Sequence, residues 1–246
     1  PFYFFLSVVY NIIILHFYTR IIKSMGKEKL KTGIRGLIFD MDGLLVDTEG
    51  LHVMAWKELF LLRGFRMKES SYAGYAGVAD TDFVERLKAE AVIPSCLCTE
   101  EIVRDKTSRL VRLADEQGIR VMPGALEILE EAKDRFLLAV ASNSEKKFVL
   151  AVLRKTGLGR FFRHVTTRND ISRPKPAADI YIETARKMGL APFRCLVFED
   201  SDVGIESARN AGMACIAISA CPGQKMAGSA DLLLNRLHPD ILKEIA

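Results

Sequence analysis

LIFDMDG, at residues 37–43, is the stretch that decides the fold class of this chain. Its first three residues are apolar, which is typical of a short strand buried on both faces of a parallel sheet. Asp40 ends the strand, and ligands of open α/β sheets bind at the carboxyl ends of strands. Asp40 and Asp42 lie two residues apart in extended chain, so their side chains point the same way. Two close carboxylates favour a hard cation such as Mg²⁺, although a strand-end turn with solvated acids produces the same pair.

Strands and helices alternate along the chain after residue 122. Apolar runs predict strands at residues 136–140, 164–167, 195–198 and 213–218. Helical spacing of apolar residues predicts helices at 125–134, 145–156, 177–188 and 203–211. Such alternation predicts an α/β fold, a Rossmann-like parallel sheet with helices on both faces.

A helical block separates the first strand from the rest of this pattern. Amphipathic spacing predicts helices at residues 49–63, 80–92 and 100–116, with no clear strand between them. We therefore expect an α/β core domain formed by residues 25–48 and 120–246, and an inserted helical cap formed by residues 49–119.

The first 24 residues form a hydrophobic extension that has two interpretations. Residues 1–18 contain no Lys, Arg, Asp or Glu, but this length is marginal for a membrane span, and Asn11 and His16 interrupt it. We favour translated upstream sequence or a non-native extension, because a hydrophilic start follows at Met25. The alternative is an N-terminal anchor with Arg20 and Lys23 on the cytoplasmic side.

Composition narrows the class of protein. The 246 residues are 49% hydrophobic with a formal net charge of +4 spread along the chain, so we expect no nucleic-acid partner. An odd count of five cysteines indicates reduced thiols and a cytoplasmic location. Cys96 and Cys98 form a lone C-x-C, so a structural zinc site is not expected. We also expect a monomer.

Three further polar stretches lie near predicted strand ends. The first is Ser142-Asn143-Ser144-Glu145, where a hydroxyl and backbone N–H groups suit a phosphate oxygen. The same residues have the spacing of a capping box, Ser142 with Glu145.

The second stretch is Lys175, which stands between two prolines, and the third is Glu199-Asp200. Lys175 suits the counter-charge of a phosphate, or is a surface lysine in a loop. Glu199 and Asp200 suit a metal shell begun by Asp40, or favour the dipole of the helix that follows. Taken in order, the acid pair, hydroxyl, lysine and second acid pair indicate a phosphoryl-transfer site.

These motifs resemble those of the haloacid dehalogenase superfamily, in the branch of β-phosphoglucomutase-like phosphatases. The resemblance covers residues 34–218. It is carried by residues 39–49 (FDMDGLLVDTE), 141–144 (ASNS), 175–181 (KPAADIY) and 198–208 (FEDSDVGIESA).

The resemblance implies a Mg²⁺-dependent phosphatase that acts on a small phosphorylated metabolite. Asp40 would attack phosphorus and form an aspartyl-phosphate, while Asp42 would act as general acid and base. Ser142 and Lys175 would hold the phosphoryl oxygens. The metal would bind Asp40, Asp42 through its carbonyl, Asp200 and Glu199, and the helical block would be a C1-type cap that excludes water.

Cap residues distinguish the possible reactions. His52 and Trp56 lie at i and i+4 on one helical face, and branch mutases share this spacing, although Trp56 also suits the core of the cap. We assign His52, Asn143 and Gly77 to substrate binding, with residues 75–80 as a loop facing the site. No arginine stands at 79 or 80, where some mutases place one, so we favour a phosphatase over a phosphomutase. A non-catalytic binding protein on the same fold is the remaining alternative, and the presence of both Asp40 and Asp42 argues against it.

Overall fold

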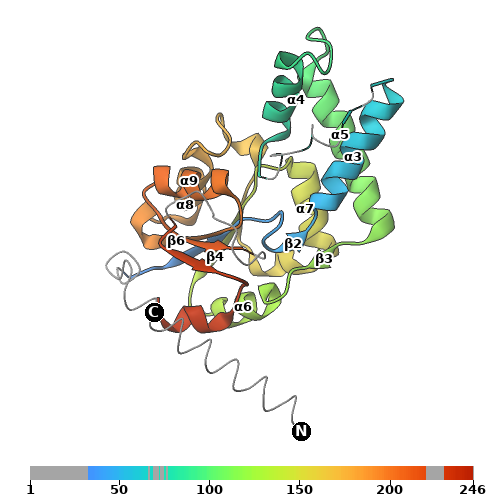
Figure 1. Ribbon diagram of the computed structural model, residues 1–246. Helices are drawn as coiled ribbons and strands as arrows, with labels where there is room; N and C mark the ends of the chain where they lie inside the picture. Colours follow the sequence, from blue (N-terminus) through green and yellow to red (C-terminus); the bar gives the residue numbers. More distant parts are fainter. Residues whose placement is uncertain are drawn as a thin grey trace.

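The computed structural model (Figure 1) describes residues 33–65, 67–68, 72, 75, 77–219 and 230–245. The hydrophobic extension at residues 1–24 lies outside this part of the chain. Across the described ranges, no helix combines the length and apolar character that a membrane crossing requires.

Six parallel strands form the central sheet, in the order β5-β4-β1-β6-β7-β8. The strands are β1 (Gly36–Phe39), β4 (Leu137–Ala141), β5 (His164–Thr166), β6 (Cys195–Glu199), β7 (Ala214–Ile218) and β8 (Leu232–Leu234). All four residues of β1 are buried, as its unbroken apolar run predicts for a strand covered on both faces. The expected α/β class is confirmed.

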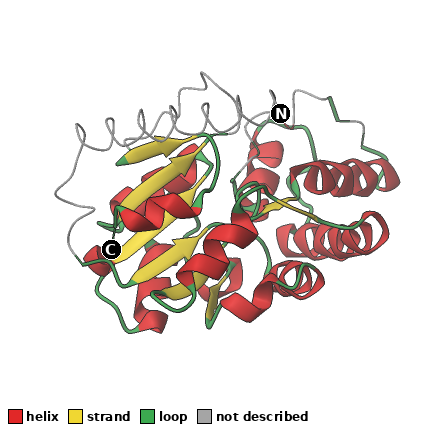
Figure 2. Ribbon diagram, turned by 90° about the horizontal axis from the view of Figure 1, so that it is seen from below, coloured by secondary structure: helices red, strands yellow, loops and turns green. Residues whose placement is uncertain are grey.

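Helices cover both faces of the sheet (Figure 2). Alternate strand residues separate into two apolar clusters, so Phe39 lies in one and Ile38 in the other. The first cluster includes residues of α6 (Ala125–Ala132) and α7 (Lys146–Lys155). The second includes residues of α8 (Asp179–Met188) and α9 (Asp202–Asn210).

Three helices stand beside the sheet, at the upper right of Figure 1. They are α3 (Glu49–Leu62), α4 (Asp80–Ala89) and α5 (Thr99–Gln117). Trp56 of α3 is fully buried, with Phe83 of α4 and Ile102 of α5 in the same apolar cluster. This position agrees with a cap-core role for Trp56. The boundaries of the core and cap domains stay a prediction.

A short two-stranded ribbon joins these helices to the sheet. β2 (Val46–Asp47) pairs antiparallel with β3 (Arg120–Val121). The sequence pattern missed both strands because two residues are too few to show a period. It also missed β8, whose three leucines carry no alternation.

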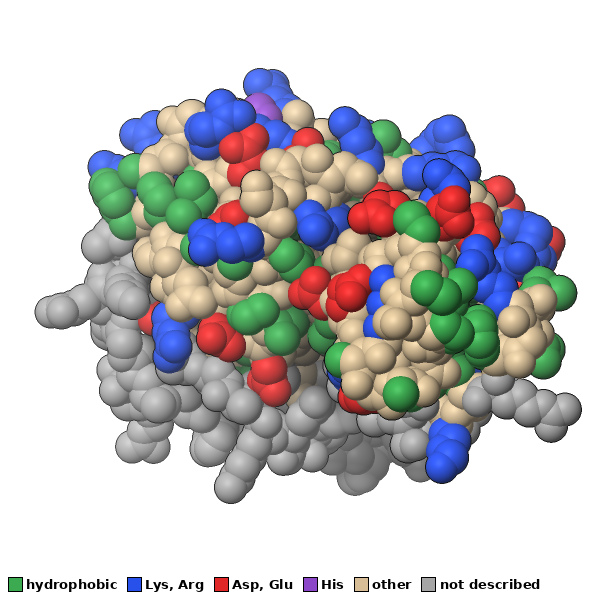
Figure 3. Space-filling model, turned by 90° about the horizontal axis from the view of Figure 1, so that it is seen from above, with side chains coloured by type: hydrophobic (Ala, Val, Ile, Leu, Met, Phe, Trp, Pro, Cys, Tyr) green, Lys and Arg blue, Asp and Glu red, His purple; other side chains and the backbone are tan. Residues whose placement is uncertain are grey.

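The surface carries both signs of charge. On the face shown in Figure 3, Lys and Arg side chains are scattered among acidic and apolar ones. This distribution agrees with the modest net charge of +4.

The stacked pair at the centre of the sheet gives a stability prediction. Phe39 and Phe198 are fully buried, with ring centroids 4.8 Å apart on neighbouring strands. Phe198→Ala should lower the free energy of unfolding by about 3–5 kcal/mol, because it removes packed surface and leaves a cavity. Phe193→Ala is the matched control, since Phe193 is 59% exposed, and should cost no more than about 0.5 kcal/mol. Urea unfolding of both variants measures the difference, and equal losses would contradict this account of the core.

Candidate active site

The predicted residues converge because their strands are neighbours. Asp40 follows β1, Ser142 follows β4, and Glu199 ends β6, and β1 lies between the other two strands. Parallel strands place their carboxyl ends at one edge of the sheet, so polar residues from distant parts of the sequence meet there.

Lys175 lies at the centre of this edge, in the loop before α8. Its ammonium donates to Asp40 Oδ1 at 2.5 Å, to Glu199 Oε1 at 2.6 Å and to the Ala141 carbonyl at 3.1 Å. Asn143 Oδ1 accepts from the Lys175 backbone N–H at 3.1 Å and fixes the loop. Lys175 is only 2% exposed, so its interpretation as a surface lysine is wrong.

Glu199 mainly anchors its neighbours. One carboxylate oxygen accepts from Lys175 and, at 2.7 Å, from the Tyr181 hydroxyl. The other accepts from the backbone N–H groups of Asp200 and Ser201 and from the Ser201 hydroxyl, at 3.0–3.1 Å. The backbone packs closely against this carboxylate, because a Cβ on Gly204 would lie 1.9 Å from Glu199 Cδ.

Asp40, Glu199 and Asp200 form a group that fits a metal ion. One carboxylate oxygen from each lies within 4.8 Å of the others. Gly43 has a φ of +84°, and a Cβ there would lie 2.1 Å from Asp200 Oδ2, so only glycine leaves room for this carboxylate. Burial, then the charges of Asp40 and Glu199, raise the pKa of Asp200 well above its ordinary value.

Asp40 shows the same need for a cation. Burial raises the pKa of Asp40, and the nearby charge of Lys175 lowers it. The charges of Glu199 and Asp42 raise it further, so that the pKa of Asp40 is about 8. The Lys175 ammonium has the opposite balance: burial lowers its pKa, but Asp40 and Glu199 raise it overall. Three carboxylates and one ammonium leave a formal charge of −2, since −3 + 1 = −2. A divalent cation with oxygen ligands cancels this charge, so the donor set fits Mg²⁺.

Asp42 interacts with a different set of groups from Asp40. Its carboxylate accepts from the hydroxyls of Thr48 at 2.5 Å, Ser144 at 2.8 Å and Ser142 at 3.0 Å. His52 Nε2 lies 3.4 Å away. Burial alone would raise the pKa of Asp42, but the hydrogen bond and charge of His52, helped by the hydroxyls, lower it far below its ordinary value.

The Asp42 carboxylate is therefore not part of the metal group formed by Asp40, Glu199 and Asp200. A ligand role for the Asp42 carbonyl stays a prediction. The capping-box interpretation of Ser142 and Glu145 is wrong, because Glu145 itself precedes α7 without a side-chain cap. The Ser142 hydroxyl instead donates to Asp42 and accepts from the backbone N–H of Ser144.

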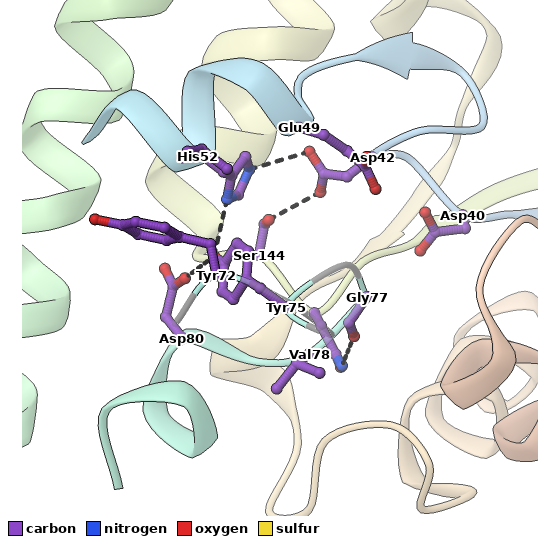
Figure 4. Close-up of a pocket in the computed structure, with 12 residues that line it drawn as sticks. Asp40, Asp42, Glu49, His52, Tyr72, Tyr75, Gly77, Val78, Asp80 and Ser144 are labelled. Atoms are coloured by element: carbon purple, nitrogen blue, oxygen red, sulfur yellow. Dashed lines mark hydrogen bonds and ion pairs between the residues drawn. The ribbon is translucent and has the colours of Figure 1, made fainter. Parts of the chain in front are cut away.

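A cavity of about 180 Å³ opens between these residues, α3 and the start of α4 (Figure 4). Its lining residues are Asp40, Asp42, Glu49, His52, Val53, Tyr72, Tyr75, Gly77, Val78, Asp80, Asn143 and Ser144. His52, Gly77 and Asn143, expected to bind substrate, all reach this cavity, and the Asn143 amide donates to the Gly77 carbonyl at 3.0 Å. Ser142 and Lys175 lie buried behind it.

Sequence reasoning missed Tyr181 and Lys106, and it placed Asp80 at the end of the loop facing the site without finding its partner. Tyr181 carried a weak signal, since it lies two residues after Asp179 on the helix that follows Lys175. Asp80 and Lys106 lie 26 residues apart on two helices, and no local pattern shows that they meet.

Comparison with known proteins gives the family. The model of the haloacid dehalogenase-like hydrolases matches residues 34–212. The chain belongs to the haloacid dehalogenase-like hydrolases. This confirms the resemblance found in the motifs and identifies the chain as an enzyme.

Relatives of this hydrolase include phosphatases. Fructose-1-phosphate phosphatase YqaB of Escherichia coli is 34% identical over 72% of this chain and 93% of its own. The crystal structure of CbbY from Rhodobacter sphaeroides with xylulose-(1,5)bisphosphate is 29% identical, has a TM-score of 0.74, and covers 82% of this chain and 94% of its own. A β-phosphoglucomutase from Clostridium difficile is 22% identical and shares the fold. Its TM-score is 0.75, and the match covers 86% of this chain and 97% of the mutase chain. The expected phosphatase class of this hydrolase is confirmed.

The buried ammonium of this hydrolase gives a stability prediction. Lys175→Met should lower the free energy of unfolding by about 3–5 kcal/mol at pH 8 without divalent cations, because Asp40 and Glu199 lose their buried counter-charge. The loss of unfolding free energy should be smaller at pH 5, where protonation of Asp40 removes its repulsion with Glu199. Lys133→Met is the control, since its pair with Glu130 is exposed and its removal should change little. Denaturant unfolding at both pH values measures the effect, and equal losses from the two variants would contradict it.

Proposed function

We propose that the chain is a Mg²⁺-dependent phosphatase that acts on a small phosphorylated metabolite, such as a sugar phosphate, through an aspartyl-phosphate on Asp40. The observation that carries the proposal is the Asp40 carboxylate, which lines the cavity while Lys175 holds its other side at 2.5 Å. Fructose-1-phosphate is the named substrate of YqaB, and this supports a sugar phosphate for the present enzyme.

The reaction has two displacement steps. In the first, a carboxylate oxygen of Asp40 attacks phosphorus, and the bond from phosphorus to the ester oxygen breaks. Asp42 gives its proton to the leaving oxygen. In the second step water attacks the phosphoryl group, Asp42 takes a proton from that water, and Asp40 is released as a carboxylate.

Each surrounding group has a role in these steps. The hydroxyl of Ser142 and the ammonium of Lys175 orient phosphoryl oxygens and offset their charge. Asp40, Asp200 and the Asp42 carbonyl would hold Mg²⁺, which would offset the charge of the transferring group when bound. Glu199 keeps Lys175 and the Asp200 loop in place. The low pKa of Asp42 keeps it mostly ionised, so leaving groups that need little protonation should react best.

We also propose that residues 49–119 act as a cap on a core formed by residues 25–48 and 120–246. The lining residue His52 of α3 lies across the cavity from Asp40 (Figure 4). Closure of the helices over the cavity would exclude bulk water during the first step. The free thiols of Cys96, Cys98, Cys195 and Cys215 support a reducing, cytoplasmic setting.

The central test is removal of the nucleophile. The full chain should hydrolyse p-nitrophenyl phosphate with Mg²⁺, and Asp40→Asn should lower kcat by about three orders of magnitude or more, because an amide does not form the acyl-phosphate. Asp134→Asn is the matched control, since Asp134 is an exposed residue outside the cavity. Full activity of Asp40→Asn would overturn the mechanism. Isomerisation of β-glucose 1-phosphate with a bisphosphate primer, without net phosphate release, would assign a phosphomutase instead.

Metal binding should depend on pH in a defined direction. Without a cation the folded chain keeps the Asp40 proton up to about pH 8, whereas the unfolded chain loses it near 3.8, so folded stability falls as pH rises through this window. Mg²⁺ binds the ionised carboxylates, so the increase in Tm on adding MgCl₂ should grow from pH 5 to pH 8. Thermal unfolding with KCl at matched ionic strength is the control. An increase in Tm with MgCl₂ that is equal at pH 5 and pH 8 would contradict the proposal that Mg²⁺ binds the ionised Asp40 carboxylate.

A further inference from the structure

The cap end of the cavity contains a buried ion pair. Lys106 of α5 is fully buried, and its ammonium lies 2.8 Å from both carboxylate oxygens of Asp80, which is 6% exposed. The same ammonium lies 2.8 Å from His52 Nδ1 and 3.1 Å from the Tyr75 hydroxyl. Tyr75 also donates to Asp80.

Asp80 neutralises Lys106 at the cap end of the cavity. The ammonium lies equally close to both carboxylate oxygens, so the negative charge of Asp80 cancels the positive charge of the lysine. Lys106 therefore offers no net charge to a ligand in the cavity.

The described residues that line the cavity provide no other cation. None of them is Lys or Arg. Lys57 lies over the ring of Tyr72, 5.7 Å from its centroid, and is not itself a lining residue. In Figure 4, Asp40 lies at one end of the cavity and Asp80 near the other.

We propose that Asp80 is a specificity-determining residue that restricts this enzyme to phosphate monoesters whose remaining part is uncharged, and that it excludes bisphosphates. The inference rests on the proposed phosphatase function and names its substrate class. One phosphate binds at the metal, Lys175 and Ser142. A second phosphate at the cap end would lose its hydration to a wall of acidic and aromatic side chains without gaining a counter-charge. A polyol instead finds an acceptor in Asp80 and hydroxyl groups in Tyr72 and Tyr75.

The test measures binding of two ligands that differ by one phosphate. Full-length chain carrying Asp40→Asn, which blocks turnover, is titrated with fructose 1-phosphate and with fructose 1,6-bisphosphate by calorimetry in MgCl₂. The bisphosphate should bind at least about ten-fold more weakly than the monophosphate, as expected for a second phosphate that loses its hydration without gaining a counter-charge. Equal or tighter binding of the bisphosphate, or no binding of the monophosphate, would overturn the inference.

Substitutions then locate the effect. Asp80→Asn, added to Asp40→Asn, leaves the charge of Lys106 uncompensated and should reduce the discrimination about ten-fold. Asp82→Asn is the matched control, since this exposed acid lies on the same helix outside the cavity, and should leave the ratio unchanged. Val78→Lys adds a cation to the lining without disturbing the buried pair, and should also favour the bisphosphate. If the ratio of the affinities for the two fructose phosphates is unchanged in both Asp80→Asn and Val78→Lys, the role of Asp80 in specificity is refuted.

The two proposals fail differently. If the native chain does not hydrolyse p-nitrophenyl phosphate, the phosphatase function is refuted. Normal hydrolysis of that compound, together with equal affinities for the two fructose phosphates, would refute only the role of Asp80.

Discussion

The buried contact of Lys175 with Asp40 and Glu199 is the constraint on which the rest of the site depends. A lysine that is 2% exposed is stable only with counter-charges in place, and these come from β1 and β6, neighbours in the sheet. The pairing requires the loop after β5 to return over the strand ends, where Asn143 holds its backbone. Because Glu199 also binds the backbone before α9, hydrogen bonds link Asp40, the Lys175 ammonium and the Asp200 loop.

Charge balance explains why the site has two separate acid environments. Near Lys175 the excess of carboxylates raises the pKa of Asp40 and Asp200 and creates a place for a divalent cation. Asp42, two residues after Asp40, instead meets Thr48 and His52 at the entry to α3, which lower its pKa. The short strand turn thus separates Asp40, in the group that fits a metal, from Asp42, whose pKa is low. This separation supports the proposed roles of nucleophile and acid–base group.

The sequence was sufficient for five of the six strands of the sheet, because LIF at residues 37–39 and the later apolar runs are the pattern that burial on both faces enforces. It was also sufficient for the order of polar residues at the strand ends, since parallel connectivity alone brings Asp40, Ser142 and Glu199 to one edge. It failed for interactions that depend on helix packing. Asp80 and Lys106 carry no local pattern, and the hydroxyls that reach Asp42 were interpreted in part as a helix cap, because capping and ligand binding use the same residue types.

Charge at the two ends of the cavity now connects the cap with the chemistry. At the core end, one lysine among three carboxylates leaves a deficit of positive charge, which a divalent cation would fill. Under the proposed function, this end then binds the phosphate that is transferred. At the cap end, the lysine is matched by Asp80. The same residue type therefore has opposite consequences in the proposed mechanism: the unbalanced acids around Lys175 bind a metal and hence a phosphate, whereas the balanced pair at Lys106 attracts no anion. A ligand with one anionic end and one uncharged end, such as a phosphorylated polyol, fits this distribution of charge.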